Sequence, residues 1–116
     1  MIFFEILNRF QDIIESYEII EFQEEDFISR LRVKVRLIDA SYLWIREVRK
    51  KNKIIAYSYY WMDNDNRILT GWDNAPHHKE IRTFPHHKHI GNSIEPSEQK
   101  SLKDVLEYIR LLLTTS

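Results

Sequence analysis

Apolar side chains recur along the chain with two different periods. In residues 2–15 they are spaced three and four apart, at Ile2, Phe3, Ile6, Leu7, Phe10, Ile13 and Ile14. That spacing predicts an amphipathic helix. Between Phe27 and Leu37 the period changes to two, and apolar residues alternate with Arg30, Arg32, Lys34 and Arg36. This alternation predicts a half-buried strand with one basic face.

Three more strands are predicted after this one, at residues 42–49, 54–62 and 67–72. The segments between them are short and rich in Asp, Asn, Ser and Lys, which are typical of turns. Short connections favour antiparallel neighbours, so residues 27–73 are expected to form a meander. Residues 73–96 contain the three prolines and Gly91, and we expect them to be irregular.

A second amphipathic pattern ends the chain, with Leu102, Val105, Leu106, Ile109, Leu112 and Leu113 on one side. Ser101 and Asp104 suit its first turn as a cap pair, and Ser97 is an alternative start. These patterns predict an α+β fold. An antiparallel sheet of four strands, or slightly more, would be packed on one face by the N- and C-terminal helices. The other face of the sheet would be open and basic.

Composition narrows the class of protein. A length of 116 residues predicts a single domain, residues 1–116. The absence of cysteine excludes a disulfide framework, a thiolate zinc site and a cysteine nucleophile. Apolar runs are only a few residues long and the N-terminus has no signal-peptide pattern, so we expect a cytoplasmic protein that does not enter a membrane.

The net charge of −1 hides two opposite blocks. Residues 1–26 hold one basic and eight acidic residues, whereas residues 27–53 hold nine basic and two acidic residues. The basic strand could therefore hold a polyanion such as RNA. Alternatively, the acidic block simply neutralises the basic one.

All five histidines lie within thirteen residues, at His77, His78, His86, His87 and His89. The string Pro-His-His-Lys occurs twice, nine residues apart. Three interpretations are open. The first is acid–base catalysis of RNA cleavage, in which Lys88 and Arg82 clamp a phosphate. The second is a divalent metal site, because His87 and His89 point to one side of an extended segment, and Asp73, His77 or His78 could supply a third ligand.

The third interpretation is that the imidazoles have no chemical role. Five histidines so close together, bracketed by prolines, favour a functional site. The spacing matches no standard zinc signature, which favours catalysis over a permanent metal site, and no cofactor is expected.

The segment 57–62 is dense in aromatic residues. Tyr57, Tyr59 and Trp61 share one face of the predicted strand, and Ser58, Tyr60 and Met62 share the other. If the first set packs inward, Tyr60 lies on the open face and could orient a phosphate or a histidine, but the reverse assignment is equally open. Arg46 could reach the same face as Arg32, Lys34 and Arg36, or form a cross-strand ion pair near Glu47.

The stretch YSYYWMDNDNRILTGWDNAPHHKEIRTFPHHKHI, residues 57–90, resembles the TumE family of toxin–antitoxin toxins. That family carries a YSYHWQD-like strand, an RWDNAPHH segment and a TFPHHKH segment, followed by a helix with a Pro-Ser opening. The resemblance covers about residues 40–110, including a Leu-x-x-Arg-Glu strand at residues 43–48. The chain departs from the family pattern at Tyr60, where histidine is frequent, and at Gly71, where arginine is common.

The resemblance implies a small toxin encoded beside an antitoxin that neutralises it. It is compatible with a ribonuclease in which the five histidines supply acid–base groups and Asp73 or Asn74 orients an imidazole. Arg82 and Lys88 would bind phosphate, and Arg32, Lys34, Arg36, Arg46 and Tyr60 would contact RNA. Two alternatives are a metal-dependent hydrolase or nucleotidyltransferase using the same loop, and a binding module without catalysis. A homodimer is a further expectation, because the exposed edge strands of such a sheet can pair with a second copy.

Overall fold

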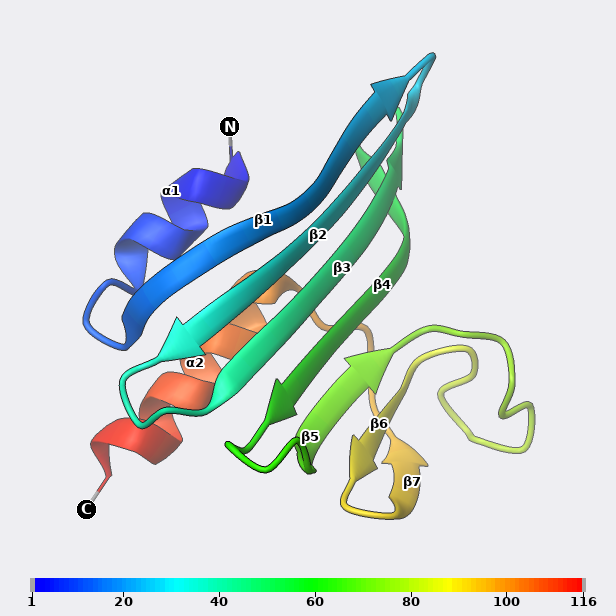
Figure 1. The fold of residues 1–116 in the computed structure, drawn as a ribbon. Helices are drawn as coiled ribbons and strands as arrows, with labels where there is room; N and C mark the ends of the chain where they lie inside the picture. Colours follow the sequence, from blue (N-terminus) through cyan, green and yellow to red (C-terminus); the bar gives the residue numbers. More distant parts are fainter. Residues whose placement is uncertain (1, 116) are drawn as a thin grey trace.

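A computed structural model describes residues 2–115, which form two helices and one seven-stranded antiparallel sheet (Figure 1). The helices are α1 (Ile2–Arg9) and α2 (Leu102–Thr114). The strands are β1 (Ile14–Glu25), β2 (Ile28–Leu37), β3 (Tyr42–Lys50), β4 (Lys53–Met62), β5 (Ile68–Asp73), β6 (His87–Ile90) and β7 (Ser93–Pro96). Each strand pairs with the next one along the chain. The predicted meander is confirmed, but the sheet has seven strands and not the predicted four or slightly more.

Both helices pack on the same face of the sheet, as the sequence predicted (Figure 1). Phe3, Leu7 and Phe10 from the N-terminal end join Leu102, Val105, Leu106 and Ile109 of α2 in one core. Tyr57, Tyr59 and Trp61 complete that core from β4, so this set faces inward and Tyr60 faces outward. The helix α2 begins at Ser101 with the expected capping box to Asp104, and Ser97 is not its start. Neither helix of the described chain is long and apolar enough to span a membrane.

The N-terminal helix was predicted to reach residue 15, but it ends at Arg9. Residues 14–25 instead form the long strand β1, which hydrophobic spacing did not predict. This acidic strand pairs with the basic strand β2, with Glu18 opposite Lys34 and Glu21 opposite Arg32. Opposite charges across a strand pair stabilise it, so charge complementarity favours a strand in this part of the chain.

Residues 73–96 were expected to be irregular, yet they include the hairpin of β6 and β7. This hairpin adds β6 to the outer edge of β5, with His87 opposite Asp73 and His89 opposite Gly71. Only four residues form each strand and most of them are polar, so the hairpin carries little hydrophobic periodicity. Its position matters for function because it carries two histidines onto the sheet.

Candidate active site

The strand register brings Asp73, His87, His89 and Tyr60 together on the open face of the sheet, opposite the helices. Ser58 of β4 pairs with Asp73 of β5, which pairs with His87 of β6. In the neighbouring row, Tyr60 pairs with Gly71, and Gly71 pairs with His89. Because side chains at alternate positions of a strand point to one face, these four residues share one surface. The prediction that His87 and His89 point to one side is confirmed.

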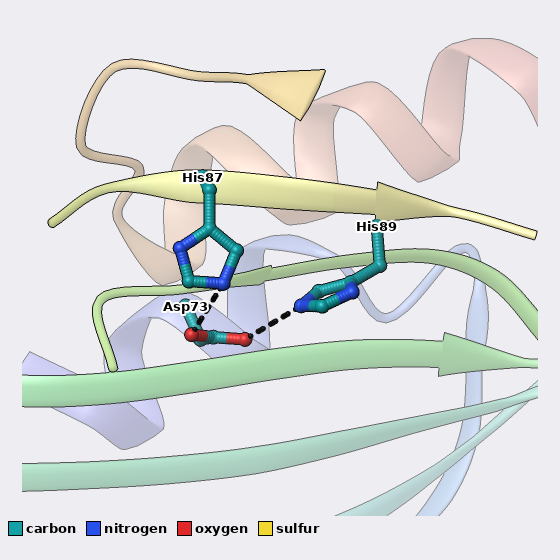
Figure 2. Close-up of side chains that lie close together, drawn as sticks. All are labelled: Asp73, His87 and His89. Carbon is teal, nitrogen blue, oxygen red and sulfur yellow. Dashed lines mark hydrogen bonds and ion pairs between the residues drawn. The ribbon is translucent and has the colours of Figure 1, made fainter. Parts of the chain in front are cut away.

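The carboxylate of Asp73 is the centre of this cluster (Figure 2). Its Oδ1 lies 2.9 Å from Nε2 of His87, and its Oδ2 lies 3.2 Å from Nε2 of His89. The Tyr60 hydroxyl donates to Oδ2 at 2.5 Å, and the Ala75 amide donates to Oδ1 at 2.9 Å. Asp73 is only 5% exposed. A buried carboxylate needs such partners, because an unpaired charge in the interior is costly.

His87 is held at both ring nitrogens. Its Nδ1 lies 2.9 Å from the carbonyl oxygen of Pro85, which only accepts hydrogen bonds, so Nδ1 carries a hydrogen. Its Nε2 faces the Asp73 carboxylate, which is also an acceptor. A proton or another cation must therefore lie between Nε2 and the carboxylate. The ring is 2% exposed, so His87 is a fixed part of the site.

His78 covers the cluster from the loop between β5 and β6. Its ring centroid lies 4.9 Å from that of His87 and 6.1 Å from that of His89, in edge-to-face orientation. His78 is partly exposed, with Glu80 3.7 Å from its Nδ1. Its neighbour His77 is exposed. Of the first histidine pair, therefore, His78 is the one that the structure brings to the cluster.

Tyr60 reaches Asp73 by lying across Gly71. A Cβ atom at Gly71 would lie 2.3 Å from Cδ1 of Tyr60, so the ring occupies the space that any other residue would fill. Burial, followed by the hydrogen bond to Asp73, raises the pKa of Tyr60 well above its usual value, so the phenol stays protonated and donates. Tyr60 and Gly71, the two positions at which the sequence departs from the pattern that it resembles, are thus direct partners across β4 and β5.

His86 is separated from this cluster. The residue precedes β6, and its Nδ1 lies 2.9 Å from the hydroxyl of Tyr57, a core residue on the helix-covered face. Burial, with a smaller contribution from His87, lowers the pKa of His86, and burial raises the pKa of Tyr57 to about 12. A neutral imidazole therefore accepts a hydrogen bond from a protonated phenol. Asn74, the predicted alternative to Asp73, instead accepts from the Tyr57 amide through its side-chain oxygen.

Lys88 and Arg82, the predicted phosphate clamp, lie away from the Asp73 cluster. Lys88 sits between His87 and His89 in β6, so it points to the helix side. Together with Arg82, Lys100, Trp72 and Tyr108 it lines a cavity of about 400 Å³ beside α2. The prediction treated residues 87–90 as part of an irregular loop, whereas alternation along the strand β6 separates Lys88 from its histidine neighbours.

Basic and aromatic side chains continue the open face beyond the cluster. One row of cross-strand neighbours holds Lys34, Trp44 and Tyr60, and the next holds Arg32, Arg46 and Ser58. The ammonium group of Lys34 lies 4.4 Å from the ring centroid of Tyr42 and 5.1 Å from that of Trp44. Trp44 was not among the predicted site residues, although its position two residues before Arg46 places it on the same face.

Charge on this face is partly neutralised at one side. Arg36 forms an ion pair with Glu15 of β1 at 3.2 Å. Of the two alternatives for Arg46, the described residues show the open face and not a cross-strand ion pair, and the neighbouring Glu47 is buried and pairs with Arg49 at 3.1 Å. Arg46 is exposed on the open face, next to Arg32. The acidic block therefore pairs with β2, while basic groups stay on the open face, and polyanion binding there stays a prediction.

The family model described as Toxin TumE matches residues 3–113. The chain belongs to the TumE toxin family. The match spans nearly the whole chain, including α1, β1 and β2, and so extends well beyond the motifs at residues 40–110. None of the curated proteins or solved structures compared with the chain matches it. Membership of this toxin family supports a toxin role and implies a cognate antitoxin.

Proposed function

We propose that this TumE-family toxin cleaves RNA, and that cleavage takes place at the cluster of Asp73, His87 and His89. One observation carries the proposal: the cluster lies on the same face of the sheet as Arg32, Lys34, Arg46 and the aromatic residues Trp44 and Tyr60. Cations on such a surface bind phosphates, and aromatic rings stack on unpaired bases. A single RNA strand crossing β2, β3 and β4 would reach the cluster on β5 and β6.

The proposed reaction is attack of a ribose 2′-oxygen on the adjacent phosphorus, with departure of the 5′-oxygen. His78 is partly exposed and is not bound to Asp73, so it is the imidazole that takes the 2′-hydroxyl proton. The cationic centre formed around His87 and His89 stabilises the negative charge on the phosphate and on the departing oxygen. The departing 5′-oxygen takes its proton from water, and the protonated His78 returns its proton to the solvent after the reaction. Asp73 positions both imidazoles, because their Nε2 atoms face its two carboxylate oxygens.

A cognate antitoxin is the expected protein partner. Homodimer formation stays a prediction, for which β1 and β7 are the available sheet edges, because they are the outermost strands of the described sheet. The charge on β1 argues against pairing of two β1 strands, since glutamates would face glutamates.

Cleavage of an end-labelled RNA by the purified protein tests the function. The wild-type protein is expected to give products, and His78→Ala is expected to slow cleavage by roughly 10²–10⁴-fold, the usual effect of removing a general base. Two matched controls are His77→Ala, which removes the exposed neighbour, and His86→Ala, which removes the histidine on the other face. Both should keep most activity. Absence of cleavage by the wild-type protein, with or without added divalent metal, would overturn the proposal.

RNA binding on the open face is tested by Arg32→Gln/Arg46→Gln. The double variant is expected to bind single-stranded RNA more weakly, and the slope of log affinity against log salt should fall by about 0.7 for each RNA phosphate that is no longer neutralised. A control with the same change in net charge is Arg9→Gln/Lys103→Gln, on the helices. Fluorescence anisotropy across a salt series measures both slopes. Equal weakening in the two double variants would mean that the open face is not the RNA-binding surface.

A further inference from the structure

We infer that Asp73, His87 and His89 form a binding site for one divalent transition-metal ion of the zinc type. The ion would be the cation at the centre of the cluster. Only the role of the ion in RNA cleavage rests on the proposed function. Metal binding itself can be measured without any RNA.

The three ligand atoms already converge. One carboxylate oxygen of Asp73 and one ring nitrogen each from His87 and His89 all lie within 4.8 Å of one another. Nε2 of His87 lies 2.9 Å from Oδ1 of Asp73, and Nε2 of His89 lies 3.2 Å from Oδ2. Two ligand atoms of a tetrahedral zinc ion are about 3.3 Å apart, so each imidazole lies at such a spacing from one oxygen of the shared carboxylate. To surround one ion, the three ligand atoms must draw closer than this 4.8 Å limit, and His89 is the one of the three residues that is not buried.

The surrounding groups hold the ligands in the orientation that a metal needs. His87 donates from Nδ1 to the Pro85 carbonyl oxygen, which leaves Nε2 as its ligand nitrogen. Metal-binding histidines usually anchor their second nitrogen in this way. The carboxylate is fixed in turn by the Tyr60 hydroxyl and the Ala75 amide. These supports come from β4 and from the loop between β5 and β6, so the site is held by the fold.

The donor set selects the class of ion. Two imidazoles and one carboxylate suit zinc and similar transition metals, whereas magnesium and calcium prefer oxygen ligands. Three protein ligands leave a coordination position open, as in catalytic rather than structural zinc sites. That position would face the open side of the sheet, which His78 partly covers. When bound, such an ion supplies positive charge to a phosphate oxygen, which is the role that the proposed function gives to this centre.

Titration of the tag-free, metal-stripped protein with zinc chloride in a calorimeter tests the site. The wild-type protein is expected to bind one equivalent, and His89→Asn and Asp73→Asn are expected to bind at least about 100-fold more weakly. His77→Asn is the matched control, because it removes an exposed imidazole outside the cluster, and it should bind like the wild type. Circular dichroism melting of each apo variant separates removal of a ligand from failure to fold. Substitution with Co²⁺ adds a visible absorption band that should disappear in His89→Asn.

The outcomes separate this inference from the proposed function. Zinc binding that is unchanged in His89→Asn, or absent from the folded wild-type protein, would overturn the metal site. If RNA cleavage then survives EDTA, the proposed function stands, with protonated imidazoles as the cationic centre. Conversely, stoichiometric zinc binding that depends on Asp73 and His89, without RNA cleavage, would support the metal site and overturn the proposed function.

Discussion

Asparagine in place of Asp73 is expected to slow RNA cleavage by roughly 10²–10⁴-fold, the range found when a carboxylate that positions a catalytic group is neutralised. The side chain keeps its shape, but one carboxylate oxygen is replaced by an NH2 group, which only donates hydrogen bonds. An asparagine can therefore accept from the Ala75 amide, or from Tyr60 and His89, but not from both sides as the carboxylate does. The charge that pairs with His87 is also removed.

Initial rates of cleavage at saturating RNA measure this effect, and thermal melting checks the fold. Asp65→Asn is the matched control, because it makes the same chemical change in the exposed turn between β4 and β5. It should leave the rate unchanged. A rate for Asp73→Asn within about threefold of the wild type, with an intact fold, would show that the cluster is not where RNA is cleaved.

Part of the site could be predicted because it follows from strand alternation alone. His87 and His89 are two residues apart, so any extended conformation places them on one face. The aromatic strand β4 likewise had only two possible orientations. Asp73 was predicted as a partner because it is an acidic residue at the start of the histidine-containing segment. Each of these predictions depends on one local conformation and not on long-range pairing.

The parts that failed depend on pairing between distant segments. The alternation that puts His87 and His89 on one face also puts His86 and Lys88 on the other, but residues 73–96 gave no strand signal, so all five histidines and Lys88 were predicted to act at one loop. The register of β5 with β6, not the spacing of the histidines, decides which of them meet Asp73. The same reason explains β1: its acidic side chains are unremarkable alone, but they complement the basic residues of β2.

The charges on β1 and β2 bear on the surface that leads to the Asp73 cluster. The basic strand β2 has the acidic strand β1 on one side and β3, which continues the open face, on the other. Arg36 forms an ion pair with Glu15 of β1. Arg32 lies opposite Glu21 of β1, in a row that continues through Arg46 and Ser58 to Asp73. A protein with a net charge of −1 can thus present a local cationic surface, and that surface extends toward the cluster.

Alanine in place of Gly71 is expected to destabilise the protein by about 1–3 kcal/mol, the usual range for overpacking a filled position. The new Cβ would lie 2.3 Å from Cδ1 and 2.5 Å from Cε1 of Tyr60, so the ring must move. Moving it breaks the 2.5 Å hydrogen bond to Asp73 and separates the ring from that of His89, whose centroid is 5.7 Å away. Cleavage should fall together with stability, because Asp73 is left with one donor fewer. Urea denaturation gives the change in the free energy of unfolding.

A double-mutant cycle shows whether Tyr60 is the cause. In the Tyr60→Ala background, Gly71→Ala should be neutral or even stabilising by up to about 1 kcal/mol, because alanine restricts the unfolded chain and the clashing ring is gone. Tyr60→Phe is the matched control: it keeps the ring over Gly71, so the penalty of Gly71→Ala should persist although the hydroxyl is absent. The same penalty in the Tyr60→Ala background would contradict this explanation. A reversed sign would show that Tyr60 and Gly71 act as one unit, in which the glycine makes room for the phenol that holds Asp73.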